Sequence, residues 1–141
     1  LHDVGKLVIA TELAGDYQKI VSLMETEKIN MYEAEQRVLG VSHADIGAYL
    51  LGLWGLPDPI VEAVCYHHSP SAYPGDRFTP LTAVHVADCM EHEPGAANNN
   101  AALDNDYLQT MGKTEQLNAW KKICRESAQG MEENELQDTL R

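Results

Sequence analysis

The sequence predicts an all-α fold, a helical bundle of roughly seven helices joined by short loops. Apolar residues recur at intervals of three and four along almost every segment, as they do on one face of a helix. Capping residues and Gly or Pro breaks separate these segments. No segment alternates apolar and polar residues over any length, so no β-strand is predicted. The 141 residues, 44% of them hydrophobic, suffice for one domain with a buried core.

The first two helices are predicted on either side of a break at Gly15-Asp16. Residues 1–13 have the helical period and form the last turns of a helix. The period resumes with apolar residues on one face: Tyr17, Ile20, Val21 and Met24. Leu1 is not a Met and lies inside the first predicted helix, so we expect a fragment or a longer protein whose upstream part is not shown.

Two capping signatures predict the next two helices. Asn30 with Glu33 predicts the start of a helix that ends at Gly40, and Ser42 with Asp45 predicts the start of the following one. The second of these helices is expected to bury a stripe of large apolar side chains: Ile46, Tyr49, Leu50, Leu53 and Trp54.

Gly and Pro residues divide the rest of the chain. Gly55 and Pro57 end the preceding helix, and Asp58-Pro59 starts the next. The core face of that helix is predicted to contain Ile60, Val61, Val64 and Cys65. Residues 69–78 read as a loop, and Thr79-Pro80 starts a helix that runs to about His92.

The C-terminal part is predicted to hold two further helices after breaks at Pro94-Gly95 and at residues 98–100. One is short and lies around Tyr107. Thr114 opens the other, an amphipathic helix that carries Leu117, Trp120, Ile123 and Cys124. Residues 129–141 are polar and form either a tail or an extension of this helix.

Composition narrows the functional classes. The net charge of −12 repels the backbone of nucleic acids and anionic lipid, so we expect no nucleic-acid partner and no membrane. No apolar run reaches the length of a membrane span, and we expect no signal peptide before the fold. The three cysteines form no CxxC pair, and free buried thiols suit a reducing, cytoplasmic compartment.

Six candidate metal ligands lie at long intervals: His2, Asp3, His43, His67, His68 and Asp88. Imidazole and carboxylate are ligands of transition-metal hydrolases, and such a mixed set suits Fe, Mn, Ni or Zn without ranking them. Asp88 lies in the apolar helical segment VHVADCM, where an unpartnered carboxylate is costly. We therefore expect the His2-Asp3 pair, at least one histidine of the 67–68 pair and Asp88 to converge in space.

Each candidate also has a reading without a metal. The His2-Asp3 pair can be partly exposed at the surface, and His43, in the first turn of its helix, can be solvated or part of a cap. The pair His67-His68 closes a helix, where a cation complements the helix dipole. His85 lies three residues before Asp88 on the same face and can be its partner instead of a metal.

The order of these residues, with the flanks LHDVGKL, SHADIGAYLL, CYHHSP and HVADCM, resembles the HD superfamily of helical metal-dependent phosphohydrolases. Its name-giving doublet matches His2 and Asp3, and its last metal-ligating Asp matches Asp88. Its first His would lie upstream of the sequence. In the HD-GYP branch, which cleaves cyclic dinucleotides, a lone His matches His43, and a His pair matches residues 67 and 68.

The chain departs from the HD-GYP pattern after the His pair. Ser69 replaces an acidic residue, and a short loop with Ala72-Tyr73-Pro74 stands where that branch has a longer one ending in Gly-Tyr-Pro. HDOD domains, a regulatory offshoot of the superfamily, are more similar, over nearly all of residues 1–128. This resemblance implies an N-terminally incomplete HD-like helical domain over residues 1–128. It also implies a signalling output module, for example in a response regulator, with other protein signalling domains as partners in cis or trans.

A metal-dependent phosphohydrolase, acting on a nucleotide or a cyclic dinucleotide, is the alternative. In that case the six candidate ligands would hold one or two ions that lower the pKa of a bound water. Asp3 would be the catalytic residue that bridges the ions or orients that water. Lys6 and Arg77 are the cations we nominate to contact a phosphate.

Overall fold

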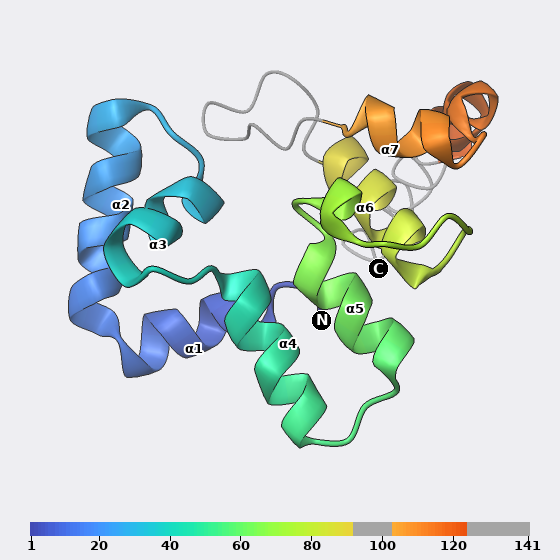
Figure 1. The fold of residues 1–141 in the computed structure, drawn as a ribbon. Coiled ribbons are helices and arrows are strands. Elements are labelled where there is room, and N and C mark those ends of the chain that lie inside the picture. Colours follow the sequence, from blue (N-terminus) through green and yellow to red (C-terminus); the bar gives the residue numbers. More distant parts are fainter. Residues whose placement is uncertain (92–102, 124–141) are drawn as a thin grey trace, which may run out of the picture. The chain divides into compact units, whose positions relative to one another are not determined.

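The computed structural model describes residues 1–91 and 103–123, and every regular element in these ranges is a helix (Figure 1). The predicted all-α fold is confirmed. The chain divides into two compact units, Leu1–Asp104 and Asn105–Arg141. None of the described helices is both long and apolar enough to cross a membrane.

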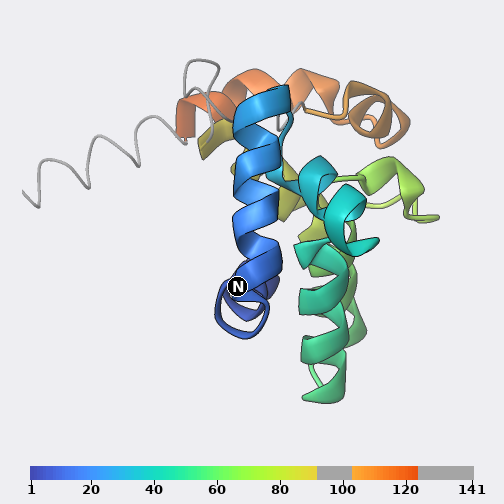
Figure 2. The same cartoon turned by 90° about the vertical axis from the view of Figure 1, so that its left-hand side faces the viewer.

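The first unit contains six α-helices and one short 3₁₀ helix within its described residues. They are α1 (Val4–Glu12), α2 (Ala14–Glu27), α3 (Met31–Leu39), α4 (His43–Leu53), α5 (Asp58–Tyr66), η1 (Pro70–Ala72) and α6 (Pro80–Glu91). Helix α4 packs against both α1 and α5, and α5 also packs against α6. Helices α2 and α3 pack against each other, and α2 also packs against α1 (Figures 1 and 2).

The second unit begins with the short helix α7 (Asn105–Thr110), which buries Tyr107 and Leu108. The 3₁₀ helix η2 (Thr114–Gln116) leads into helical residues 117–123. Both helices predicted here are therefore found, with Thr114 at the start of the second. Cys124, the predicted breaks at residues 94–100 and the predicted tail at 129–141 lie outside the described residues.

Two predicted boundaries near the start of the chain are wrong. Helix α1 begins at Val4, so Leu1, His2 and Asp3 form a turn before it and are not inside it. The break between α1 and α2 falls at Leu13, whose φ of −123° and ψ of 43° are not helical. Gly15 and Asp16 belong to the first turn of α2 instead. An acidic side chain is favourable there because it faces the positive end of the helix dipole.

The predicted caps of α3 and α4 are confirmed. The Asn30 side chain accepts a hydrogen bond of 2.8 Å from the backbone N–H of Glu33, and α3 ends at Gly40 with a φ of 74°. Ser42 and Asp45 form a reciprocal capping box. This box fixes the start of α4, so His43 is its first residue.

The predicted buried stripe of α4 is wrong. Tyr49, Leu53 and Trp54 are 72%, 66% and 64% exposed, and Ile46 and Leu50 are half-buried. The face that is buried carries smaller residues together with the histidine: His43, Ala44, Gly47, Ala48 and Leu51.

Close approach between helices explains why α4 buries its small-residue face. A Cβ at Gly5 of α1 would lie 2.0 Å from the backbone oxygen of His43. A Cβ at Gly47 would lie 3.2 Å from side-chain atoms of both Val4 and Val64. Large side chains do not fit at such distances, so they occupy the outer face of α4. On α5, Val64 is buried as predicted, with Val61 and Cys65 half-buried beside it.

Candidate metal centre

Four of the predicted ligands meet in the first unit, although 65 residues separate the first from the last. Asp3 caps the start of α1, His43 begins α4, and His67 and His68 directly follow α5. One ligand atom from each lies within 4.8 Å of all the others. We call these four residues the ligand cluster.

The distances within the ligand cluster are short. His43 Nε2 lies 3.3 Å from Asp3 Oδ1 and 3.0 Å from His68 Nε2. His67 Nε2 lies 3.8 Å from the same Asp3 oxygen. Two imidazoles therefore direct their Nε2 atoms toward one carboxylate oxygen, and the third places its Nε2 beside that of His43.

Hydrogen bonds on the far side of two rings fix this orientation. His43 Nδ1 lies 2.6 Å from Oε2 of Glu35, which also accepts the backbone N–H of His43 at 2.7 Å. His67 Nδ1 donates to the backbone oxygen of Val64 at 2.7 Å. Each Nδ1 therefore carries the proton, and each Nε2 presents a lone pair to the centre, as metal-binding histidines commonly do.

Glu35 is the functional residue that sequence reasoning missed. It lies on α3 and is fully buried, which is rare for a glutamate unless it is paired. The sequence carries no local signal for this role, because the burial of Glu35 beside Ala34 is visible only in the fold. Its partner, eight residues away on another helix, becomes visible only in the fold.

Two buried polar atoms in the cluster have no hydrogen-bond partner: Asp3 Oδ1 and His67 Nε2. At 3.8 Å they are too far apart to bond to each other. Leaving such atoms unsatisfied costs about 1–3 kcal/mol each. A cation bound between them would satisfy both, so the donor set fits a metal ion.

The protonation of the cluster suits metal binding. Burial lowers the pKa of His67 to about 4, and burial with the neighbouring imidazoles lowers the pKa of His68 to about 2. Both rings are neutral at physiological pH. Burial tends to raise the pKa of Asp3, but the neighbouring His43 ring and the hydrogen-bonded Lys6 ammonium outweigh it and hold that pKa well below its usual range. The carboxylate is therefore ionised.

The pKa of His43 moves the other way. Burial lowers it, but the carboxylates of Asp3 and Glu35 beside the ring together raise it above its ordinary value. The ring thus lies between two carboxylates, one on each nitrogen. A bound cation at Nε2 would replace a proton there.

His2 and Asp88 lie beside the ligand cluster and outside its four converging atoms. His2 Nε2 is 3.5 Å from Asp3 Oδ2 and also 3.5 Å from Asp88 Oδ1. The Asp88 side chain is only 5% exposed, so this contact offsets part of the cost of its burial. The structure therefore brings all six predicted ligands into one region, as expected.

His85 has a supporting place in this region. Its Nδ1 donates to the backbone oxygen of His67 at 2.7 Å, and its Nε2 accepts the backbone N–H of Asp104 at 3.0 Å. Helix α6 thereby holds the backbone of the His pair. Both ring nitrogens of His85 bond to backbone groups.

The two residues predicted to contact a phosphate, Lys6 and Arg77, differ in their surroundings. Lys6 Nζ lies 2.8 Å from Asp3 Oδ2, directly beside the ligand cluster. Arg77 has a 93% exposed side chain, 4.0 Å from its neighbour Asp76. Among the described residues, no recorded contact joins Arg77 to the cluster.

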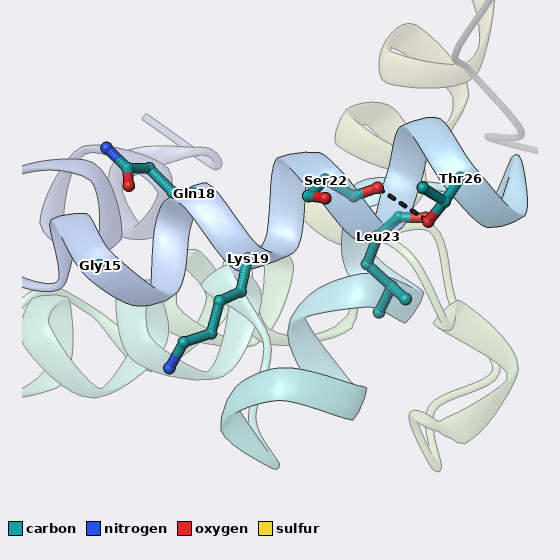
Figure 3. A pocket seen from close by; sticks show the side chains of 6 residues that line it. All are labelled: Gly15, Gln18, Lys19, Ser22, Leu23 and Thr26. Atoms are coloured by element: carbon teal, nitrogen blue, oxygen red, sulfur yellow. Dashed lines mark hydrogen bonds between the residues drawn. The ribbon is translucent and has the colours of Figure 1, made fainter.

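A groove elsewhere in the first unit has no connection with the cluster. It is an open strip of about 500 Å³ along one face of α2 (Figure 3), lined by Gly15, Gln18, Lys19, Ser22, Leu23 and Thr26. The Thr26 hydroxyl donates within the helix to the Ser22 backbone oxygen, and Lys19 pairs with Asp16. These polar groups are satisfied locally, and the groove contains none of the predicted ligands.

Comparison with known proteins agrees with this geometry. Residues 1–70 match the HDOD domain family. This part of the chain belongs to the HDOD family. All four residues of the ligand cluster lie in this HDOD segment, whereas Asp88 follows it.

Two relatives extend the HDOD comparison. A solved HDOD domain protein of unknown function from Geobacter sulfurreducens is 25% identical, with a TM-score of 0.67 over 80% of this chain. An uncharacterized protein from Treponema pallidum (strain Nichols) is 27% identical over 81 residues, or 57% of this chain. The chain covers 41% of the Geobacter chain and 16% of the Treponema protein, so it spans less than half of either.

Proposed function

We propose that the chain is a regulatory output module of bacterial signal transduction, cytoplasmic, whose HDOD fold is held together by a divalent metal ion. Its partners are other protein signalling domains, in the same polypeptide or in another. One observation carries the proposal: four candidate ligands from three separate parts of the fold converge within 4.8 Å. Four protein ligands complete the coordination of a structural ion, whereas a catalytic zinc site keeps a position open.

The spacing of the ligand cluster supports a four-coordinate ion. A tetrahedral ion with bonds of about 2.0–2.1 Å places its ligand atoms about 3.3–3.4 Å apart. The distances of 3.0, 3.3 and 3.8 Å within the cluster surround this value. Three imidazoles and one carboxylate suit zinc best among the metals compatible with the ligands.

The surroundings of the cluster support a regulatory role over hydrolysis. Ser69 follows the His pair where the phosphodiesterase branch has an acid, and the next residues form the short 3₁₀ helix η1. Lys6, the cation beside the cluster, is already paired with Asp3. A phosphate substrate would have to compete with that carboxylate for the lysine.

A metal-dependent phosphohydrolase remains the second candidate, because the cluster is reachable from solvent on one side. The side chains of His2, Asp3 and Lys6 are 28%, 35% and 32% exposed. An additional ligand, such as a water or a phosphate oxygen, can approach from this side. Lys6 would then be the residue that contacts the phosphate.

Two measurements on the protein test the proposal. Elemental analysis after purification without chelators should find close to one equivalent of metal, which Asp3→Ala loses. Assays with Mn²⁺, Fe²⁺, Ni²⁺ or Zn²⁺ against cyclic dinucleotides, nucleotides and a generic phosphodiester should show no robust turnover. Turnover that disappears in folded Asp3→Ala and Asp88→Ala variants would replace the regulatory proposal with the hydrolase.

A further inference from the structure

The outer face of α4 carries an apolar surface that the fold leaves uncovered. Tyr49, Leu53 and Trp54 are each about two-thirds exposed or more. Tyr49 and Leu53 are four residues apart and so are neighbours on the helix, and Trp54 directly follows. We call these three residues the α4 patch.

The α4 patch is large for a surface that interacts only with water. Two aromatic side chains and a leucine at these exposures present on the order of 300–400 Å², the size of the largest patches on typical monomers. A Cβ at Gly52 or Gly55 would meet nothing within 4 Å, so the surface beside the patch is open. Exposed Trp and Tyr are enriched at protein interfaces.

The segment that carries the patch has acidic side chains and no Lys or Arg. Residues 38–76 contain no Lys or Arg, so α4, the loop after it and α5 have no side-chain cation apart from any protonated histidine. Asp45 and Asp58 are both exposed. Asp45 lies one helical turn before Tyr49, and Asp58 starts α5 just after the patch. The patch is therefore apolar with acidic flanks.

We propose that the α4 patch is the docking surface for a basic amphipathic segment of a partner protein. Such a segment would place apolar side chains on Tyr49, Leu53 and Trp54 and its Lys or Arg residues near Asp45 and Asp58. This inference rests on the proposed role as a protein-binding module and names the surface and the chemistry of the partner.

Area and charge favour this occupant over a second copy of the chain. A stable protein interface buries about 800 Å² on each partner, roughly twice the area of the patch. Two copies would also bring together surfaces of a protein with a net charge of −12. A short segment of opposite charge needs less area and is attracted at a distance.

The test uses a fluorescently labelled Leu-Lys peptide designed as an amphipathic helix and the whole protein. Anisotropy should show saturable binding that Leu53→Ser and Tyr49→Ser each weaken about tenfold or more. A peptide of the same composition in scrambled order should bind at least about tenfold more weakly, because net charge alone does not place apolar groups on the patch.

Leu7→Ser is the matched control. Leu7 is 67% exposed on α1, close to the 66% of Leu53, and lies two residues from both Gly5 and Ile9, the buried residues of that helix. It therefore points about 160° away from the packed face. Leu7→Ser should bind the peptide as the original protein does, and circular dichroism should show all variants folded.

Several experimental results would contradict the inference. Equal loss of binding in Leu7→Ser and Leu53→Ser, equal binding of the scrambled peptide, or no binding up to millimolar peptide would overturn the inference. So would a concentration-dependent dimer in sedimentation that Leu53→Ser abolishes, or binding of the patch to anionic phosphatidylglycerol vesicles. Metal content and turnover, which test the proposed function, do not enter these readouts, so either proposal can fail alone.

Discussion

At the scale of single residues, the candidate metal centre depends on groups that sequence reasoning could find and on one that it could not. The order of His and Asp residues and the cost of burying Asp88 predicted convergence, and the fold places all six near one another. Glu35 was missed because its importance comes from full burial against His43, and nothing local distinguishes it from a solvated glutamate.

Replacing Glu35 by Gln should weaken metal binding by about 10–100-fold, the usual effect of losing a residue that orients a ligand. The amide keeps the size of the side chain but removes the charge that polarises the His43 ring. Competition with a chromophoric chelator measures the change. Glu33→Gln, on the same helix at a half-buried position that pairs with Arg37, is the control and should leave affinity unchanged. Equal affinities for the two variants would contradict the positioning role.

Acid should destabilise the metal-free protein. His67 has a pKa of about 4 in the fold against an ordinary 6.5, so the unfolded chain binds the proton first. The stability that this neutral ring contributes is present above pH 6.5 and is lost as pH falls toward 4. His68 acts in the same direction, while the raised pKa of His43 opposes them. Because two of the three pKa values are lowered and one is raised, we expect a net loss of folding stability as the pH falls.

Urea unfolding measures this dependence. Between about pH 7.5 and about pH 5, the free energy of unfolding should fall by on the order of 2 kcal/mol. Bound metal should enlarge the loss, because protons compete for its ligands. A free energy that stays constant or rises on acidification would show that these imidazoles are not held neutral in the fold.

At the scale of elements, local signals were reliable where they act through the backbone. Asn30, Gly40 and the Ser42–Asp45 box set helix ends because their hydrogen bonds and φ values are local. The buried face of α4 was predicted wrongly because it depends on how closely α1 and α5 approach. Apolar residues surround most of α4, so periodicity did not reveal that the small ones face inward.

Two glycine substitutions separate close approach from helix propensity. Gly5→Ala should lower the free energy of unfolding by about 1–3 kcal/mol or more, since its Cβ would collide with the His43 backbone. A Cβ at Gly15, in the first turn of α2, would meet nothing within 4 Å. Gly15→Ala should therefore raise the free energy of unfolding by about 0.5–1 kcal/mol. Thermal or chemical unfolding of both variants provides the comparison. A Gly5→Ala protein as stable as the original would contradict the tight α1–α4 contact.

At the scale of the molecule, the ligand cluster lies where three helices that already pack together through α4 begin or end. Asp3 precedes α1, His43 begins α4, and the His pair ends α5, so one ion would tie three helices at one point. Without it, Asp3 Oδ1 and His67 Nε2 stay buried and unsatisfied. The sequence motif predicted these residues as ligands, but only the fold shows that they lie together at the ends of these helices.

Metal binding should therefore stabilise the protein in proportion to its concentration. Because the ion binds the folded state through ligands that are far apart in the unfolded chain, a free metal level of 100 times Kd should add about 2.7 kcal/mol to the free energy of unfolding. Chelator-stripped protein titrated with Zn²⁺ and melted at each step shows the effect as a rising Tm. Asp3→Asn and His67→Gln should abolish the rise, because the first removes the negative charge of one candidate ligand and the second removes the buried Nε2 that the ion would satisfy. Asp16→Asn, on the exposed surface of α2, should keep the full rise. An equal rise in all three variants would mean that the ion binds elsewhere and that the ligand cluster is only a set of mutually buried polar groups.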